Sequence, residues 1–242
     1  MAGQSIEEWY RSLPIITRIG LTTFFGSSAL FMIGILNPEL ITLNWLLVIN
    51  KFHLWRLITC CFFLGKFSFN FLFQLYFWVT FSSKLENNEL MQQPGDYVWF
   101  LLIVIVLLCV ISLLLAWPVG LPMLGPSLIF AVLYYWSRRE PYAELNMMSF
   151  AIKGYQFPFV MMMFTLLMGG SIWGDLLGLA AGHVYYFCRE IMPQTYGINI
   201  ISTPGFLARA MVKYQPQAPG APPPVAPQRP LFQGGGQRLG GN

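Results

Sequence analysis

The sequence has little charge. Only 10% of its 242 residues are Asp, Glu, Lys or Arg, whereas a soluble globular protein has roughly 25%. Hydrophobic residues make up 56% of the chain, Phe occurs 21 times, and the mean hydropathy is +0.57. This shortage of charge excludes a disordered chain, a coiled coil and almost any water-soluble enzyme, and it predicts a polytopic membrane protein.

Acidic residues are missing from the C-terminal part. From Thr203 to the last residue there is no acid, and the bases are Arg209, Lys213, Arg229 and Arg238. The whole net charge of +4 therefore lies in this Pro- and Gly-rich part. Scattered bases do not form the dense basic face that nucleic-acid binding needs, which argues against a nucleic-acid partner. Attraction to an anionic membrane surface is the simpler interpretation.

The sequence also lacks a cysteine framework. Its 4 cysteines have neither disulfide nor zinc-ligand spacing, so apolar packing is expected for them, and no metal or cofactor is predicted. The first fifteen residues lack the long apolar core of a cleavable signal peptide. Instead, Ser5-x-x-Glu8 has the form of a capping box. It predicts a short amphipathic helix within residues 1–16 that lies in the membrane interface.

Apolar segments are plentiful, and several approach the roughly 20 helical residues that a hydrocarbon core of about 30 Å needs. They predict an all-α membrane domain (17–190) with six transmembrane helices, at about 17–36, 67–85, 97–116, 121–137, 157–171 and 173–190. The second segment contains Asn70 and Gln74, and the fifth is short, between Pro158 and Gly169. If these two lay in the interface, the number of spans would be four.

Lys and Arg predict the orientation, because they are enriched in cytoplasmic loops. With six spans and a cytosolic N-terminus, both termini are cytosolic, and only Lys51, Arg56 and Lys66 face the other side, all in the first loop (37–66). That loop is too long for a turn and rich in apolar side chains, so we expect it to rest in the outer leaflet. There the ring of Trp55 would seek the interface, and the guanidinium of Arg56 would snorkel or cap carbonyls.

Strongly polar residues inside the spans are functional candidates, because they are costly in hydrocarbon. Asn70 and Gln74 lie on one face of the second helix. Ser127 follows Gly125-Pro126 in the fourth segment, and His183 lies midway along the sixth. The structural alternative for these side chains is hydrogen bonding between helices.

The sixth segment carries a stripe of small residues, Gly174, Gly178 and Gly182, at four-residue spacing. Such a stripe lets another helix approach closely, and packing inside the bundle is favoured over homodimerisation. Asp175 lies at the outer end of the same segment, where the helix dipole stabilises a carboxylate near the N-terminal amides.

These motifs resemble those of known families. The rhomboid layout is matched by Asn70-Phe-Leu-Phe-Gln74, Gly125-Pro-Ser127 and Gly178-x-x-x-Gly182-His183. More narrowly, other segments resemble the Derlin family, in the right order and over nearly the whole chain: Trp55-Arg56, Tyr134-Tyr-Trp-Ser-Arg-Arg-Glu-Pro141, Gly182-His183-Val-Tyr-Tyr-Phe187 and Thr203-Pro204. The resemblance implies a rhomboid-like fold in the endoplasmic-reticulum membrane.

The C-terminal segment (191–242) contains the most specific motif. Its residues 232–239 match the short Derlin motif that docks the valosin-containing AAA ATPase, with Phe232, Gly234, Gly236, Gln237, Arg238 and Leu239 as the expected docking residues. The motif supplies an aromatic anchor, a backbone able to lie close to a partner, and an Arg-Leu pair that sets the register. The preceding Pro-rich stretch (215–230) is expected to be a spacer. A Gly-rich linker without a partner is the alternative.

The resemblance leaves a catalytic alternative open. Rhomboid proteases pair a Gly-x-Ser-Gly serine in the fourth helix with a histidine in the sixth, and this chain keeps Gly125-Pro-Ser127 and His183. Leu128 replaces the following glycine and would crowd the oxyanion region, and Asn70 and Gln74 replace a histidine and an asparagine. A catalytically inactive relative is therefore expected, and an intramembrane serine protease with a Ser127/His183 dyad is the alternative.

For a Derlin, the resemblance implies a part in endoplasmic-reticulum-associated degradation, in which misfolded clients move to the cytosol and the ATPase pulls them. It also implies a membrane ubiquitin ligase complex, further Derlin copies in a homo- or hetero-oligomer, and membrane lipids as partners. The candidates for a client groove or for local membrane thinning are Trp55, Arg56, Asn70, Gln74, Ser127 and His183. A secondary transporter is a third reading, but the internal repeats of those folds are not evident.

Overall fold

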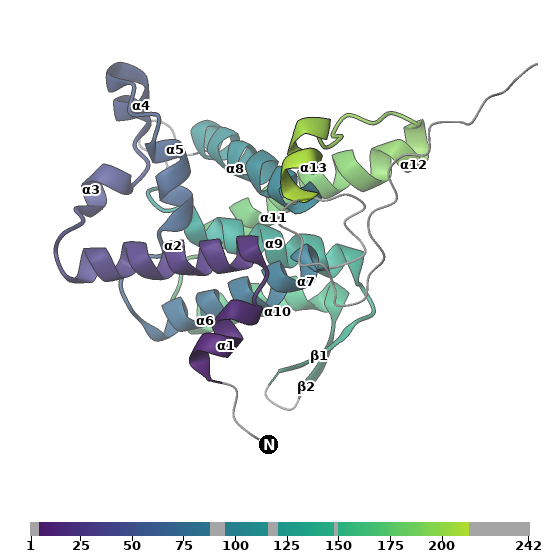
Figure 1. Ribbon diagram of the computed structural model, residues 1–242, viewed down its shortest axis with the longest axis horizontal. Helices are drawn as coiled ribbons and strands as arrows, with labels where there is room; N and C mark the ends of the chain where they lie inside the picture. Colours follow the sequence, from purple (N-terminus) through teal and green to yellow (C-terminus); the bar gives the residue numbers. More distant parts are fainter. Residues whose placement is uncertain (1–4, 88–94, 116–120, 148–149, 213–242) are drawn as a thin grey trace, which may run out of the picture.

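The computed structural model describes residues 5–87, 95–115, 121–147 and 150–212, most of them in helices. Helices occupy all six predicted segments: α2 (Ile15–Met32), α6 (Phe69–Phe77) with α7 (Ser83–Glu86), α8 (Asp96–Leu115), α9 (Gly125–Arg139), α10 (Phe157–Leu167) and α11 (Ile172–Tyr186) (Figure 1). By length and composition alone, α2 and α8 are suited to cross a membrane. Six spans with cytosolic termini stay a prediction.

Two helix boundaries differ from the prediction because of proline and glycine. Helix α9 begins at Gly125, with Pro126 in its first turn, where the fixed φ of proline suits a helix start. The predicted start at residue 121 was therefore one turn too early. Helix α10 ends at Leu167, and Gly169 just beyond it has a φ of +73°, which only glycine adopts readily. The predicted end at residue 171 was too late.

Two of the helical segments contain a π-helical turn. In the second segment, η2 (Trp78–Ser82) joins α6 to α7. In the last one, η4 (Phe187–Ile191) joins α11 to α12 (Met192–Tyr196), which ends at Gly197 with a φ of +68°. Turns of this kind are frequent at functional sites. The last helical segment therefore runs six residues beyond the predicted end at 190.

A β-hairpin corrects the all-α prediction. Strands β1 (Glu144–Met147) and β2 (Phe150–Lys153) pair antiparallel, with Glu144 opposite Lys153, an arrangement that opposite charges favour. The amide of Gly154 then donates to the carbonyl of Ala143 at 2.9 Å. The hairpin, at the bottom of Figure 1, lies far from the first-loop helices at the upper left.

The first loop contains short helices, which were not predicted from the sequence. It contains α3 (Pro38–Ile41), α4 (Trp45–Lys51), α5 (Arg56–Thr59) and the 3-10 turn η1 (Cys60–Phe62). Its buried apolar side chains are Ile41, Leu43, Trp45, Val48, Cys60, Cys61, Phe63 and Leu64, and its exposed ones are Leu40, Leu46, Ile49, Phe52, Leu54, Trp55 and Ile58. Exposed apolar surface of this extent suits contact with lipid. The placement in the outer leaflet stays a prediction.

Arg56 connects the parts of this loop. Its side chain is only 3% exposed, and its guanidinium donates to the carbonyls of Glu39 and Thr42. The indole of neighbouring Trp55 donates to the carbonyl of Leu40 at 3.4 Å. Of the two roles expected for Arg56, capping of carbonyls is therefore the one observed.

The N-terminal helix α1 (Ile6–Ser12) has the predicted capping box. The amide of Glu8 donates to the hydroxyl of Ser5 at 3.2 Å, and the amide of Ser5 donates to the Glu8 carboxylate at 3.1 Å. No residue of α1 is buried. The helix is thus confirmed, while its place in the membrane interface stays a prediction.

The start of the C-terminal segment is fastened to the bundle. Asp96 accepts hydrogen bonds from Thr203 and, at 3.3 Å, from Arg189, which also donates to the carbonyl of Ile201. Helix α13 (Gly205–Val212) follows, and the backbone of Leu207 lies close to Gly95. The spacer (215–230) and the docking motif (232–239) lie outside the described residues.

The core forms where α9 packs on α11. Every residue of α9 from Ser127 to Ser137 is buried. A Cβ atom at Gly178 would come within 2.3 Å of the Ser127 carbonyl oxygen, and one at Gly182 within 3.1 Å of the Ala131 carbonyl. At Gly174 the nearest atom, the Ser127 hydroxyl, would be 3.5 Å away. The small-residue stripe thus packs inside the bundle, as predicted, and its close contacts are at Gly178 and Gly182.

We predict that Gly178→Ala lowers the stability of the protein by about 1–3 kcal/mol, because the added methyl group overlaps backbone that cannot yield. Thermal unfolding of the detergent-solubilised chain measures this effect. Gly174→Ala is the matched control, since an added Cβ there meets only ordinary van der Waals contact. Equal melting temperatures for the two variants would contradict the proposed close packing.

We also predict that Arg56→Gln loosens the first loop, because each hydrogen bond from a charged donor contributes about 1.5–3 kcal/mol. Hydrogen exchange should accelerate at the amides of Thr42 and Leu43, which donate to the carbonyls of Pro38 and Pro122. Lys51→Gln, an exposed base of the same loop, is the control and should leave this exchange unchanged. Unaltered protection in Arg56→Gln would show that the guanidinium does not hold the loop.

Candidate functional site

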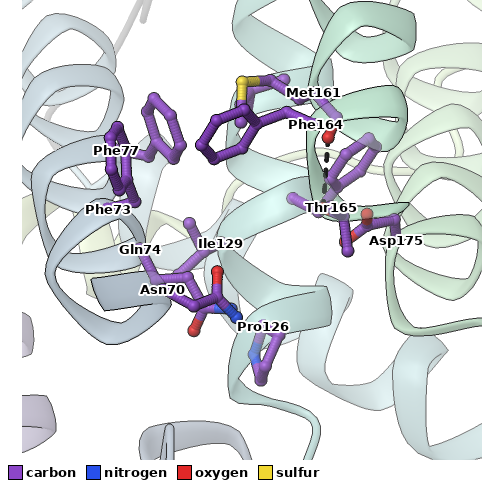
Figure 2. A pocket seen from close by; sticks show the side chains of 12 residues that line it. Asn70, Phe73, Gln74, Phe77, Pro126, Ile129, Met161, Phe164, Thr165 and Asp175 are labelled. Carbon is purple, nitrogen blue, oxygen red and sulfur yellow. Dashed lines mark hydrogen bonds between the residues drawn. The ribbon is translucent and has the colours of Figure 1, made fainter. Parts of the chain in front are cut away.

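Polar side chains from three helices line a cavity of about 280 Å³. Asn70 and Gln74 come from α6, Thr165 from α10, and Asp175 from α11, and Figure 2 shows them around Pro126 at the start of α9. The other lining residues are Leu64, Leu121, Pro122, Met123, Gly170, Ser171 and Gly174. A pocket of about 30 Å³ adjoins the cavity and is walled mainly by aromatic and aliphatic side chains.

Local structure explains this convergence. Asn70 and Gln74 are one helical turn apart, so both point to the same side of α6, as their spacing predicts. The tight connection between α10 and α11 brings Thr165 beside Asp175, because the amide of Gly170 donates to the Thr165 carbonyl at 2.9 Å. The cavity therefore lies where helix ends meet, and it is open at the surface of the bundle, where Asn70, Met123 and Ser171 are exposed.

Two buried oxygen atoms on the cavity wall have no hydrogen-bond partner within the part of the chain that the structure describes. They are Oε1 of Gln74 and Oδ2 of Asp175. The hydroxyl of Thr165 donates to the carbonyl of Met161 at 3.1 Å. Buried polar atoms are nearly always paired, so these two acceptors mark the cavity as a site that can receive a donor.

Asp175 was not predicted as a site residue. It lies in the first turn of α11, as expected, where the helix dipole favours a carboxylate. However, its Oδ2 has no hydrogen-bond donor among the described residues. Its side chain is only 7% exposed. The available signal was its charge, because an ionisable residue inside a predicted span is a functional candidate regardless of its position on the helix.

Ser127 and His183 are not joined as a catalytic pair. Ser127 is fully buried, and its hydroxyl has no hydrogen-bond partner among the described residues. The Nδ1 of His183 instead lies 2.7 Å from the hydroxyl of Tyr134. Tyr134 is seven residues beyond Ser127, about 10 Å along the α9 axis. A nucleophile and its base must lie within hydrogen-bond reach, and this arrangement does not provide that.

The segment Tyr134–Pro141, which suggested the Derlin family, fastens one end of the bundle. Tyr135 donates to Glu190 at 3.0 Å, and Arg139 forms an ion pair with the same carboxylate at 2.6 Å. The ammonium group of Lys84 lies 4.5 Å from the centre of the Trp136 ring, a cation–π arrangement. The motif therefore links α9 to η4 and to α7.

The predicted site residues fall into separate groups. Asn70 and Gln74 line the cavity, whereas Ser127 and His183 lie at the contact between α9 and α11. Trp55 and Arg56 hold the first loop together and are not among the cavity-lining residues. Within the described residues, no three His, Cys, Asp or Glu side chains are grouped so that they could hold a metal ion. The cysteines are free, and Cys60, Cys61 and Cys109 are buried.

Known proteins resemble this chain over most of its length. The model of the Der1-like family matches residues 13–205. Derlin-2.2 of Arabidopsis thaliana is 32% identical over 212 residues, which cover 84% of this chain and 87% of the relative. Derlin-1 of Arabidopsis thaliana is 34% identical, covering 88% and 80%. Derlin-1 of Oryza sativa is 32% identical, covering 96% and 97%. The chain therefore belongs to the Der1-like family, the Derlins, and this membership supports a membrane protein with a role related to endoplasmic-reticulum-associated degradation.

Proposed function

We propose that this protein is a catalytically inactive, rhomboid-like component of endoplasmic-reticulum-associated degradation. It resides in the endoplasmic-reticulum membrane with both termini in the cytosol and takes part in moving misfolded proteins to the cytosol. Its C-terminal motif (232–239) recruits the valosin-containing AAA ATPase. A membrane ubiquitin ligase complex and further Derlin copies are its expected partners.

The observation that carries this proposal is the polar cavity between α6, α10 and α11. A client chain that crosses a membrane must not expose its polar groups fully to hydrocarbon, because each unsatisfied group costs several kcal/mol. Asn70, Gln74 and Asp175 offer hydrogen-bonding groups in a cavity that is open at the surface of a largely apolar bundle. The cavity can therefore receive part of such a chain.

Short helices beside the cavity support local thinning of the bilayer. Helix α9 has 15 residues and α10 has 11, which correspond to about 22 Å and 16 Å. The hydrocarbon core is about 30 Å thick. A helix shorter than the core is accommodated by thinning of the bilayer, and a thinner bilayer shortens the path of a polar client chain.

The α9–α11 contact supports the inactive form over the protease. His183 is bonded to Tyr134, and Ser127 is buried under α11 without a base. Leu128 is fully buried beside it, and Ser127 is not among the residues that line the cavity. We therefore assign Ser127 and His183 to helix packing.

We predict that Ser127→Ala leaves client degradation intact, because the hydroxyl makes no hydrogen bond within the described structure. A pulse-chase of a misfolded membrane client in cells that carry only the variant measures this. The control is a cell line without the chain, in which the client should persist. If the variant loses cleavage of a client, the protease alternative is correct instead.

We predict that Arg238→Ala weakens binding of the AAA ATPase by tenfold or more, because an arginine in a docking interface is a typical hot spot, worth about 2 kcal/mol or more. A detergent pull-down of the full chain with the purified ATPase measures the loss. Arg229→Ala removes the same charge outside the motif and should bind normally. Retained binding after deletion of residues 231–242 would disprove docking by the tail.

A further inference from the structure

The cavity wall combines two hydrogen-bond acceptors with one negative charge. Gln74 Oε1 and Asp175 Oδ2 belong to α6 and α11, and both are buried without a donor in the described part of the chain. Among the lining residues there is no Lys, Arg or His. The wall therefore provides two unpaired acceptor atoms and a carboxylate, and no cationic side chain is among the residues that line it.

The charge of Asp175 defines the complementary ligand. Its place in the first turn of α11 favours the ionised carboxylate, because the helix dipole is positive there. A buried carboxylate is costly unless a cation and hydrogen-bond donors accompany it. A basic side chain supplies both. In turn, a Lys or Arg within a membrane segment is costly in lipid until it finds such a partner.

The lining of the cavity suits the aliphatic part of a basic side chain. Leu64, Pro122 and Met123 line the same cavity. They provide an apolar wall for the aliphatic stem of a lysine or arginine whose charged end reaches inward.

We infer that Asp175, together with Gln74, forms a recognition site for a basic side chain carried by the membrane-embedded segment of a client. This inference rests on the proposed function, since the guest is a client, and it adds the chemistry by which the client is selected. A client segment with a misplaced Lys or Arg binds at this site, and the same segment with an apolar residue binds only through general contacts.

The test uses the full chain in a maltoside detergent, which contains no ammonium headgroup. Fluorescence anisotropy measures the affinity for single-span peptides that differ at one position near the lumenal end: Lys, acetylated Lys, Leu or Glu. We expect the Lys peptide to bind about 10- to 100-fold more tightly than the Leu peptide, the range of a charge-assisted hydrogen bond. Acetylation should abolish the preference without altering the protein, and the Glu peptide should bind least.

Variants then locate the site. Asp175→Asn should bind the Lys and Leu peptides equally, and Asp175→Glu should retain the preference for Lys. Glu39→Gln, which removes an exposed carboxylate on the same predicted side of the membrane, should behave like the unaltered chain. Equal affinity of the unaltered chain for Lys, acetyl-Lys and Leu peptides would overturn the inference. A preference for Lys that persists in a folded Asp175→Asn variant would also overturn it.

The outcomes separate this inference from the proposed function. If the chain prefers the Lys peptide in vitro but client degradation is normal in cells without the chain, the recognition site is supported and the proposed function is wrong. If client degradation needs the chain but is the same for Lys and Leu versions of one client, and the chain shows no preference in vitro, the proposed function is supported and the recognition site is wrong.

Discussion

The close contact between the backbones of α9 and α11 is the constraint on which the rest of the structure depends. Gly178 lies against the carbonyl of Ser127, and helices in this contact cannot slide along each other without a clash. The register places Tyr134 beside His183 and leaves Ser127 next to Gly174. Residues that look catalytic in the sequence are thereby fixed in positions where they serve packing.

The two ends of this bundle are secured by different chemistry. At one end, Arg56 donates to the carbonyls of Glu39 and Thr42, and Trp55 donates to that of Leu40. These bonds hold together a loop that is rich in exposed apolar side chains. At the other end, Asp96 gathers Arg189 and Thr203. The second arrangement fixes where the C-terminal segment leaves the bundle.

The features that could be predicted from the sequence are those that depend on neighbours along the chain. Hydropathy located the helical segments, the spacing of Gly178 and Gly182 indicated a packing face, and Ser5-x-x-Glu8 indicated the helix start. The hydrogen bonds from Arg189 and Thr203 to Asp96 could not be predicted, because these partners are 93 and 107 residues away along the chain. The π-turns were missed because apolar periodicity does not reveal one extra residue in a turn. The hairpin was missed because strands of four residues are too short to show a clear alternation.

Hydrogen bonding distinguishes the polar residues that stabilise the bundle from those that are available to a ligand. An unpaired His183 would be costly within the membrane, but its Nδ1 is hydrogen-bonded to the hydroxyl of Tyr134. Arg138 in turn donates to the same hydroxyl at 3.0 Å. Gln74 and Asp175 are equally costly, yet the folded chain supplies no donor for their buried oxygens among the described residues. A buried polar residue without a hydrogen-bond partner lowers the stability of the fold, and such residues are expected at functional sites. In the cavity on α6 and α11, the basic side chain that we infer for a client supplies the missing hydrogen-bond donor.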